Sequence, residues 1–470
     1  MKYKLLLAAA CSLLFTFHAT AQPNIIGNWV GNLEAGTMKL RIVYRLFVKE
    51  GVMRCSMDSP DQGVRGVNVS DVSQTADSIW LGAGPMVYRG RIVNDSTIDG
   101  VLQQGRSFPL KLRRTDQVER KRPQTPKAPF PYASNQVVYS NKDKSVTLGA
   151  TITAPKDSQK HPAVLLISGS GQQNRDGEIM EHKPFAVIAD YLSRKGYVVL
   201  RVDDRGIGKS TGDLSRATSA DFAKDAGISL DYLKNRPEVD PQKIGVLGHS
   251  EGGMIASILA AERQDIAFVI SMAGPGVANL QLLTEQNDAL LEKRGIASDA
   301  RKAYLKLYGN MLRAGMQKDS ALELNAAINK VVSDWRTATS VSIVEQTTGI
   351  RDDSTQKSFA SAFAGQIRIP WFRYFIAYDP APVIRKLSGK VLVINGAQDI
   401  QVSPKSNIAG WRNALGKSKV KSSKVVELPG LNHLFQKCTR CDVDEYGELE
   451  QTMAPEVLTL IGDWLDKEIK

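Results

Sequence analysis

The sequence predicts an α/β protein in which a mostly parallel sheet carries helices on both faces, with a small antiparallel β domain in front of it. Apolar runs of strand length alternate with helical apolar spacing over residues 133–275 and 386–470, as a doubly wound sheet requires. Residues 22–115 instead alternate apolar and polar side chains between turn clusters, which favours antiparallel strands. Residues 276–385 show only helical spacing, and we expect them to form a helical cap.

The length of the chain also favours more than one folded unit. A single hydrophobic core usually stops growing below 470 residues. Within the predicted β domain, residues 38–46 alternate clearly, and clusters at 58–63 and 94–96 mark turns. Residues 116–132 are rich in Pro, Lys and Arg, a composition typical of a stiff, charged linker. We therefore expect this linker to join the β domain to the α/β domain.

Residues 1–21 have the pattern of a secretory signal peptide. A positively charged start is followed by an apolar stretch at 5–17, which is too short to span a bilayer, and by the small residues 19–21. We expect the mature chain to begin at Gln22 and to be exported to the periplasm or beyond. No later stretch reaches 18 uninterrupted apolar residues, so the sequence predicts no membrane span.

The chain is basic, with a formal net charge of +12 and a pI near 9.3. Loss of Lys2 and Lys4 with the signal peptide would lower the charge to +10. The positive charges gather in the linker and at 417–424, without interleaved aromatic residues or a DNA-binding motif. We therefore interpret them as a solvated surface and predict no nucleic-acid partner.

A serine lies at a sharp turn between an apolar strand-like run and a helix-like stretch. The run is 244–247, the turn is Gly248-His249-Ser250-Glu251-Gly252, and the helical spacing covers 253–261. Small residues two before and two after a serine let the backbone fold tightly enough to expose its hydroxyl above a sheet. Ser250 is therefore the candidate nucleophile.

A serine nucleophile needs a histidine base and a carboxylate that orients the histidine. Of the five histidines, only His433 lies well downstream of Ser250, in a loop after an apolar run. Asp399 follows the strand-like run 390–394, where the acid is expected in the order Ser, Asp, His. We predict Asp399 as the acid, with Asp379 and Asp442 as the nearest substitutes.

An acyl-transfer site also needs backbone N–H donors for the developing oxyanion. One is expected from Glu251, the residue after the nucleophile, and the other from the loop 168–171, which follows the strand-like run 163–167. Ser170 is the predicted second donor, with Gly171 as the alternative. This loop has neither the G-x-G-x-x-G spacing nor a Walker lysine, so we do not expect nucleotide binding. A triad with backbone donors needs no metal or organic cofactor, and we predict none.

Taken together, these motifs resemble those of the bacterial α/β-hydrolase esterases related to serine aminopeptidases and lysophospholipases. The resemblance covers most of residues 133–470 and includes the segments 168–171, 174–177, 203–212, 248–252, 395–399 and 432–436. It implies the α/β-hydrolase fold and a serine carboxylesterase that acts on small acyl esters through Ser250, Asp399 and His433. Fold kinship does not fix the substrate.

Two other functions stay open at the level of sequence. A serine peptidase or aminopeptidase would use the same triad, and an aminopeptidase would need acidic cap residues such as Glu285, Glu292 or Asp299 to bind a free amino terminus. A catalytically idle protein whose β domain binds glycan or cell wall is the second alternative. An intact Ser, Asp and His in the expected order argues against an idle enzyme.

The predicted cap is rich in aromatic residues that either line an acyl pocket or pack its helices together. These residues are Trp335, Trp371, Phe372, Tyr374 and Phe375.

Two cysteines follow the predicted histidine base at a spacing of three, Cys438 and Cys441. This spacing fits a short-loop disulfide, half of a zinc site or a redox pair. Zinc needs about four ligands and the sequence offers no second pair, so we do not expect a metal. In an exported protein we expect a structural disulfide that stiffens the histidine loop, with Cys55 left unpaired.

Overall fold

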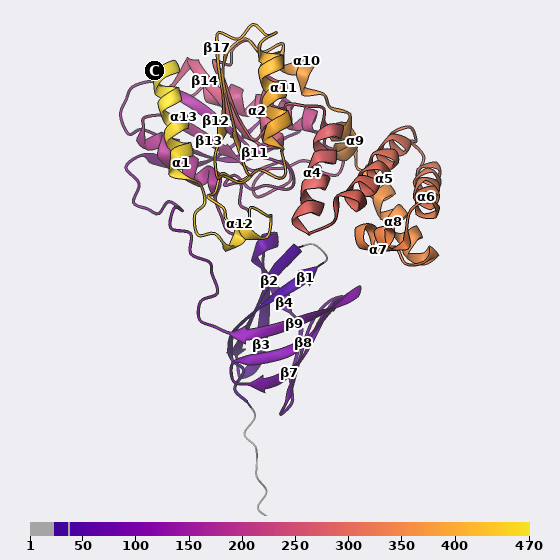
Figure 1. Cartoon of the computed structure of the whole chain (residues 1–470). Helices are drawn as coiled ribbons and strands as arrows, with labels where there is room; N and C mark the ends of the chain where they lie inside the picture. Colours follow the sequence, from indigo (N-terminus) through magenta and orange to yellow (C-terminus); the bar gives the residue numbers. More distant parts are fainter. Residues whose placement is uncertain (1–22, 36–37) are drawn as a thin grey trace, which may run out of the picture. The chain divides into compact units, whose positions relative to one another are not determined.

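The computed structural model describes residues 23–35 and 38–470, and the chain divides into two compact units between Glu119 and Arg120 (Figure 1). The predicted signal peptide, residues 1–21, lies outside the described residues. In the described part of the chain, no helix combines the length and the apolar character that crossing a bilayer requires.

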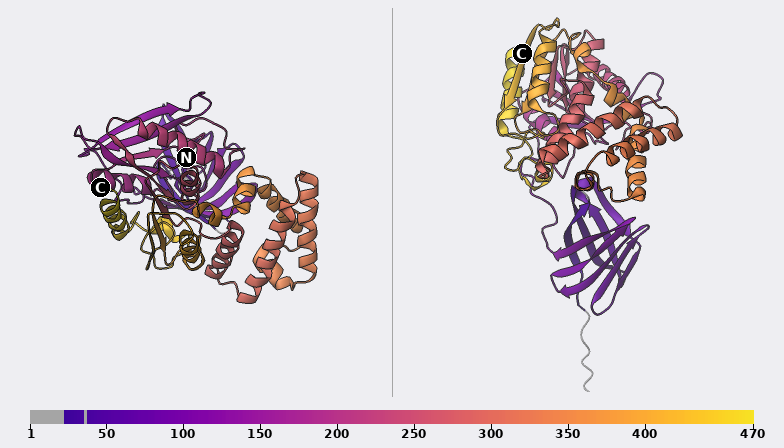
Figure 2. Two further views of the ribbon diagram at one scale, coloured as in Figure 1. Left: turned by 90° about the horizontal axis from the view of Figure 1, so that it is seen from above. Right: turned by 45° about the vertical axis from the view of Figure 1, so that its right-hand side comes forward.

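The first unit is a single antiparallel sheet of nine strands, as the alternating pattern predicts (Figure 2). The strand order is β4-β3-β2-β1-β9-β8-β7-β6-β5. Its inner face is filled by apolar side chains, among them Trp29, Tyr44 and Tyr88. The strands are β1 (Gly27–Ala35), β2 (Met38–Lys49), β3 (Val52–Ser59), β4 (Val64–Val69), β5 (Asp71–Gln74), β6 (Ser78–Ala83), β7 (Met86–Asn94), β8 (Thr97–Gln104) and β9 (Arg106–Arg114), with a short 3-10 turn, η1 (Pro60–Gln62).

The second unit is built on an eight-stranded sheet with the order β10-β11-β13-β12-β14-β15-β16-β17. At one edge of the sheet, β11 pairs antiparallel with both β10 and β13. All the other neighbouring strands in this order pair in parallel. The strands are β10 (Ala133–Ser140), β11 (Thr147–Ala154), β12 (His161–Ile167), β13 (Val198–Val202), β14 (Val239–His249), β15 (Phe268–Met272), β16 (Lys390–Gly396) and β17 (Ser422–Leu428).

Helices cover both faces of this sheet because alternate strand residues are apolar on each side. Ala163, Leu165 and Ile167 of β12 face one core, while Val164 and Leu166 face the other. The first core includes side chains of α2 (Ser219–Lys234), α3 (Glu251–Glu262) and α11 (Pro404–Leu415), and the second includes those of α1 (Pro184–Arg194) and α13 (Pro455–Glu468). The predicted α/β-hydrolase architecture is confirmed.

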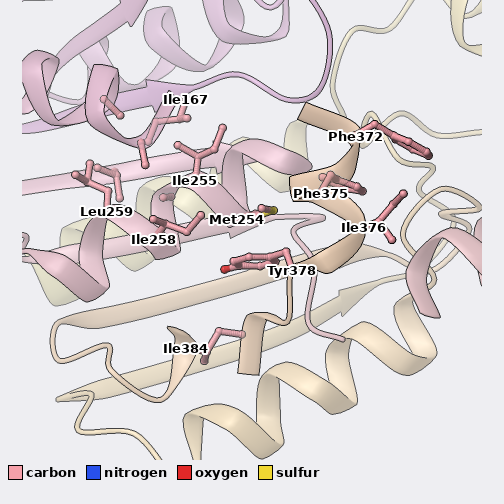
Figure 3. Close-up of a cluster of buried hydrophobic side chains, with 14 of the residues drawn as sticks. Ile167, Met254, Ile255, Ile258, Leu259, Phe372, Phe375, Ile376, Tyr378 and Ile384 are labelled. Atoms are coloured by element: carbon pink, nitrogen blue, oxygen red, sulfur yellow. The ribbon is translucent and has the colours of Figure 1, made fainter. Parts of the chain in front are cut away.

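Between β15 and β16 the chain is helical throughout and forms the cap. The helices are α4 (Asn279–Lys293), α5 (Ser298–Met316), α6 (Ala321–Thr337), α7 (Val341–Thr348), α8 (Asp353–Ile367), α9 (Pro370–Ala377) and α10 (Pro380–Ile384). Figure 3 shows how the cap joins the sheet layer: Phe372, Phe375 and Ile376 of α9 belong to one apolar cluster with Met254 and Ile255 of α3.

The second half of the predicted linker is attached to the second unit by hydrogen bonds. Arg122 donates to the carbonyl oxygens of Met180, Gly447 and Leu449 at 2.7–2.8 Å. The Gln124 side chain donates to the carbonyl of Met453 at 2.7 Å. Residues 120–132 therefore belong structurally to the α/β unit, close to the short helix α12 (Glu445–Glu448).

Two acidic residues at the carboxyl end of β13 hold the loop that follows β12. Asp203 pairs with Arg175, whose Nε lies 2.9 Å from Oδ1, while Asp204 accepts hydrogen bonds from the Ser168 hydroxyl and from the Gln173 N–H at 2.9 Å. Burial and, to a lesser extent, the charges of nearby acids raise the pKa of Asp204 to about 7, although the hydrogen bonds from Ser168 and Gln173 lower it. The loop that is predicted to carry an oxyanion donor is thus tied to the neighbouring strand.

The raised pKa of Asp204 predicts a pH-dependent stability. Between about pH 4 and 7 the folded state binds a proton at Asp204 that the unfolded chain has lost, so the free energy of unfolding falls as pH rises, by up to about 4 kcal/mol. Asp204→Asn mimics the protonated acid and should flatten this slope. Urea denaturation of both proteins from pH 4.5 to 8 measures it; equal slopes would contradict the prediction.

Candidate active site

Ser250 lies in the strained turn that joins β14 to α3. Its backbone has φ 56° and ψ −123°, and its N–H donates to the carbonyl of Met272 on the adjacent strand at 2.8 Å. A Cβ on Gly248 would come within 2.0 Å of the Gly252 carbonyl oxygen, and one on Gly252 within 2.1 Å of that of Ile167. The turn therefore requires glycine at both positions, as the motif predicts.

The loops after β16 and β17 bring Asp399 and His433 together. The Nδ1 atom of His433 lies 2.8 Å from Oδ2 of Asp399, and both side chains are almost fully buried. The other carboxylate oxygen accepts the backbone N–H groups of Gln401 and Val402 at 2.8 and 2.9 Å, which fixes its orientation. This pairing favours the imidazole tautomer with its proton on Nδ1 and leaves the Nε2 lone pair as the base.

The two substitute acids are engaged elsewhere. Asp379 accepts a hydrogen bond from the Ala381 N–H at the start of α10, at 3.0 Å. Asp442 pairs with Arg440 at 3.1 Å. Among the described residues, Asp399 is therefore the acid that orients His433.

Two further residues hold the histidine loop. The side-chain oxygen of Asn432 accepts the N–H groups of Leu434 and Gln436 at 3.0 and 2.9 Å. His249, the residue before Ser250, bonds through Nε2 to the backbone carbonyl of His433 at 2.9 Å. Burial, and then the neighbouring His433, lower the pKa of His249 to about 4, so its neutral ring donates this bond. The sequence had marked His249 only as a neighbour of the serine.

Ser250 and His433 line one cavity of about 320 Å³. The cap contributes apolar walls from α4 and α9, and glutamine side chains add amide groups. Of the described residues that line it, the ionisable ones are His249, Glu251 and His433. The site thus offers a largely neutral pocket beside the serine.

The loop after β12 approaches the nucleophile closely. A Cβ on Gly169 would lie 3.3 Å from the Cβ of Ser250, and Ser170 lines the same cavity. Glu251 is the first residue of α3, where backbone N–H groups have no acceptor within the helix. The structure therefore brings both residues predicted as oxyanion donors beside Ser250.

The side chain of Glu251 was not part of the sequence prediction. It is 2% exposed, and its Oε1 accepts hydrogen bonds from the Ser219 hydroxyl at 2.6 Å and the Trp371 indole N–H at 2.7 Å. Burial raises the pKa of this carboxyl, and its hydrogen bonds oppose that rise. No sequence signal links residues 120 positions apart.

The cap aromatics divide into two groups. Trp371, Phe372 and Phe375 line the cavity, with the rings of Trp371 and Phe375 stacked at 5.4 Å. Trp335 packs inside the cap and donates its indole N–H to the carbonyl of Ala303 at 3.0 Å, and Tyr374 packs against the core cluster away from the cavity lining.

The three cap acids considered for amine binding do not line the cavity. Glu285 accepts hydrogen bonds from Gln281 and Ser406, Glu292 pairs with Arg301 at 3.2 Å, and Asp299 lies in the first turn of α5.

The cysteines after His433 form the expected disulfide, Cys438–Cys441, and Cys55 is free and buried. The Glu445 carboxylate accepts the N–H groups of Thr439, Arg440 and Cys441 at 2.7–3.3 Å. The disulfide and Glu445 together stiffen the loop. Because the two sulfurs are bonded to each other, they do not offer thiolates to a metal.

Several known proteins are similar to this chain. The esterase EstD of Thermotoga maritima is 26% identical over 325 residues, covering 68% of this chain and 66% of that protein, just under two thirds. An uncharacterised 31.7 kDa protein from the traX-finO intergenic region of Escherichia coli is 21% identical over 330 residues, covering 68% and 96%.

Among solved structures, the Pyrococcus furiosus esterase Pf2001 is 17% identical with a TM-score of 0.40, covering 72% of this chain and 94% of that one. Est1E from Butyrivibrio proteoclasticus, solved with ferulic acid, is 18% identical with a TM-score of 0.41, covering 71% and 99%. A family model described as the alpha/beta hydrolase fold matches residues 162–437, more than half of the chain. The strand order and the turn at Ser250 agree with that match, and the chain belongs to the alpha/beta hydrolase fold family.

Proposed function

We propose that this protein is a serine carboxylesterase that hydrolyses carboxylic esters through an acyl-enzyme on Ser250. The observation that carries the proposal is the cavity shared by Ser250 and His433, with Nδ1 of His433 2.8 Å from the buried Asp399. The similarity to the esterase EstD supports the same reaction class.

In this mechanism His433 takes the proton of the Ser250 hydroxyl as its oxygen attacks the ester carbonyl carbon. The backbone N–H groups of Ser170 and Glu251 stabilise the oxyanion of the tetrahedral intermediate. The intermediate collapses, His433 protonates the leaving alkoxide, and the acyl group stays on Ser250. Water activated by His433 then releases the carboxylic acid. Asp399 orients the imidazole and stabilises its charged form throughout.

The electrostatics of the cavity favour an ester over an amino-terminal peptide substrate. A free ammonium group needs an acidic partner once it leaves water. Glu251 is the carboxylate that lines the cavity, and neutral donors already occupy its Oε1 atom. Glu285, Glu292 and Asp299, the cap acids considered as candidates for binding a free amino terminus, do not line the cavity.

We also propose that the protein is exported, with residues 1–21 removed as a signal peptide. The charged start, apolar stretch and small-residue site support this reading of the sequence. The Cys438–Cys441 disulfide supports an oxidising compartment.

Ser250→Ala should lower kcat/KM for p-nitrophenyl esters by at least about a thousandfold, because the nucleophile is lost while the binding cavity stays. A series from acetate to laurate measures the rate and the preferred chain length. A fluorophosphonate probe should label Ser250 in the wild type.

Ser257→Ala is the matched control, since its hydroxyl bonds to the Gly253 carbonyl within α3 and does not line the cavity. Aminoacyl-p-nitroanilides should be turned over far more slowly than the esters. Anilide turnover above ester turnover would assign the protein to the peptidases. Silence on both panels, with no labelling of Ser250, would reject a serine hydrolase.

Expression of the full chain in a Gram-negative host should yield a periplasmic protein that begins at Gln22. Its non-reduced digest should contain the linked Cys438–Cys441 peptide, while Cys55 should react with an alkylating agent only after unfolding, since burial raises its pKa to about 12. N-terminal sequencing and peptide mass measurement test both points. Retention of residues 1–21, or free thiols at both loop cysteines, would refute export with an oxidised loop.

A further inference from the structure

The Glu251 carboxylate joins three segments that lie far apart in the sequence. Its Oε1 atom accepts hydrogen bonds from Ser219 at the start of α2 and from Trp371 on cap helix α9, and the Ser170 hydroxyl on the loop after β12 acts to lower its pKa. All three side chains are neutral donors, which match a carboxylate that only accepts hydrogen bonds.

Burying a carboxylate carries a cost in stability. A well-packed apolar side chain in the same place is often neutral or stabilising by comparison, even where a buried charge is fully paired. Glu251 is nonetheless 2% exposed, and no cation is among the partners that bind its side chain. Because a buried carboxylate lowers stability relative to an apolar side chain, its presence here points to a role in the site.

Two of these three side chains, those of Ser170 and Trp371, also belong to functional parts of the site. The backbone N–H groups of Ser170 and of Glu251 itself are the ones assigned to the oxyanion. The Trp371 ring lines the cavity and stacks on Phe375, and its N–H points to Glu251. Side chains of α9 and α3 belong to the same apolar cluster (Figure 3). The hydrogen bond between Trp371 and Glu251 therefore joins two helices that this cluster also holds together.

We propose that the side chain of Glu251 is a positioning residue: held by Trp371 and Ser219, it sets the two oxyanion donors in place relative to Ser250. The cap helix α9 then supports the oxyanion hole as well as forming a wall of the acyl pocket. This inference rests on the proposed esterase reaction.

The role of Trp371 as a pocket wall and its role in positioning affect different substrates. A wall residue alters only acyl chains that are long enough to touch it. A residue that positions the oxyanion donors alters every substrate, including acetate, because each acyl transfer passes through the same oxyanion. It also lowers kcat more than it changes KM, since the contact matters most in the transition state.

The test compares Trp371→Phe and Ser219→Ala with the wild type on p-nitrophenyl acetate and octanoate. Ser219 does not line the cavity, so it reaches the reaction only through Glu251. We expect each variant to lower kcat about tenfold on both esters, with KM for acetate changed by less than about twofold. Rates are expressed per serine titrated by the fluorophosphonate probe, which removes misfolded protein from the comparison.

Trp335→Phe is the matched control. It makes the same substitution in the cap and removes an indole hydrogen bond of 3.0 Å that lies away from the cavity, so kcat on acetate should stay at the wild-type value.

An acetate kcat unchanged in both Trp371→Phe and Ser219→Ala would overturn the inference, as would a loss confined to octanoate. An equal loss in Trp335→Phe would also overturn it, because the effect would then be a general loosening of the cap. These results leave the esterase proposal intact, since that proposal fails only if the wild type neither hydrolyses the esters nor reacts with the probe.

Discussion

The backbone of Ser250 is held at φ 56° and ψ −123°, and neighbouring parts of the α/β unit sustain that conformation. Such a conformation costs on the order of 1–3 kcal/mol for a residue other than glycine and persists only where its surroundings enforce it. Gly248 and Gly252 leave the space for the turn, and the bond to Met272 anchors it to the neighbouring strand. The turn lies at the carboxyl ends of parallel strands, where the loops that carry Asp399 and His433 also begin.

Around this turn, buried carboxylates are held mainly by neutral donors. Asp399 accepts two backbone N–H groups besides His433, Asp204 accepts a hydroxyl and a backbone N–H, and Glu251 accepts hydroxyl and indole donors. By contrast, Asp203, one residue from Asp204, pairs with Arg175. In the proposed reaction, donors fixed in this way would keep a set orientation as charge develops on the substrate, so the site would need little reorganisation.

The sequence predicted the parts of the site that follow from local order. Ser250, Asp399 and His433 each come directly after a strand-like run, and in a parallel sheet such loops meet at one edge. Neither the bond between Glu251 and Trp371 nor the contact of His249 with His433 leaves a local pattern, because each joins segments more than 100 residues apart. Such contacts depend on the packing of the whole cap and sheet.

Composition and periodicity did not predict two further features, the places of the cap tryptophans and the attachment of the linker. Trp371 and Trp335 both lie on amphipathic helices, and only the packing places one ring at the cavity and the other inside the cap. The basic, proline-rich segment at 116–132 is predicted from its composition to be a stiff, charged linker. A guanidinium also binds backbone carbonyls well, and Arg122 does so at three positions, so composition alone does not separate a free linker from an attached one.

In the proposed esterase, the cavity also limits which acyl groups fit. Its apolar walls and the absence of Lys and Arg among the described lining residues leave a substrate carboxylate or phosphate without a partner, so a charged acyl group would lose its hydration uncompensated. One methylene more or less changes the rate only about 10- to 200-fold in such a pocket, whereas a polar contact discriminates more strongly. Gln286 and Gln366 of the cap line the cavity and offer amide groups for such a contact. Selectivity among uncharged acyl groups should therefore depend more on hydroxyl or carbonyl substituents that reach these amides than on chain length.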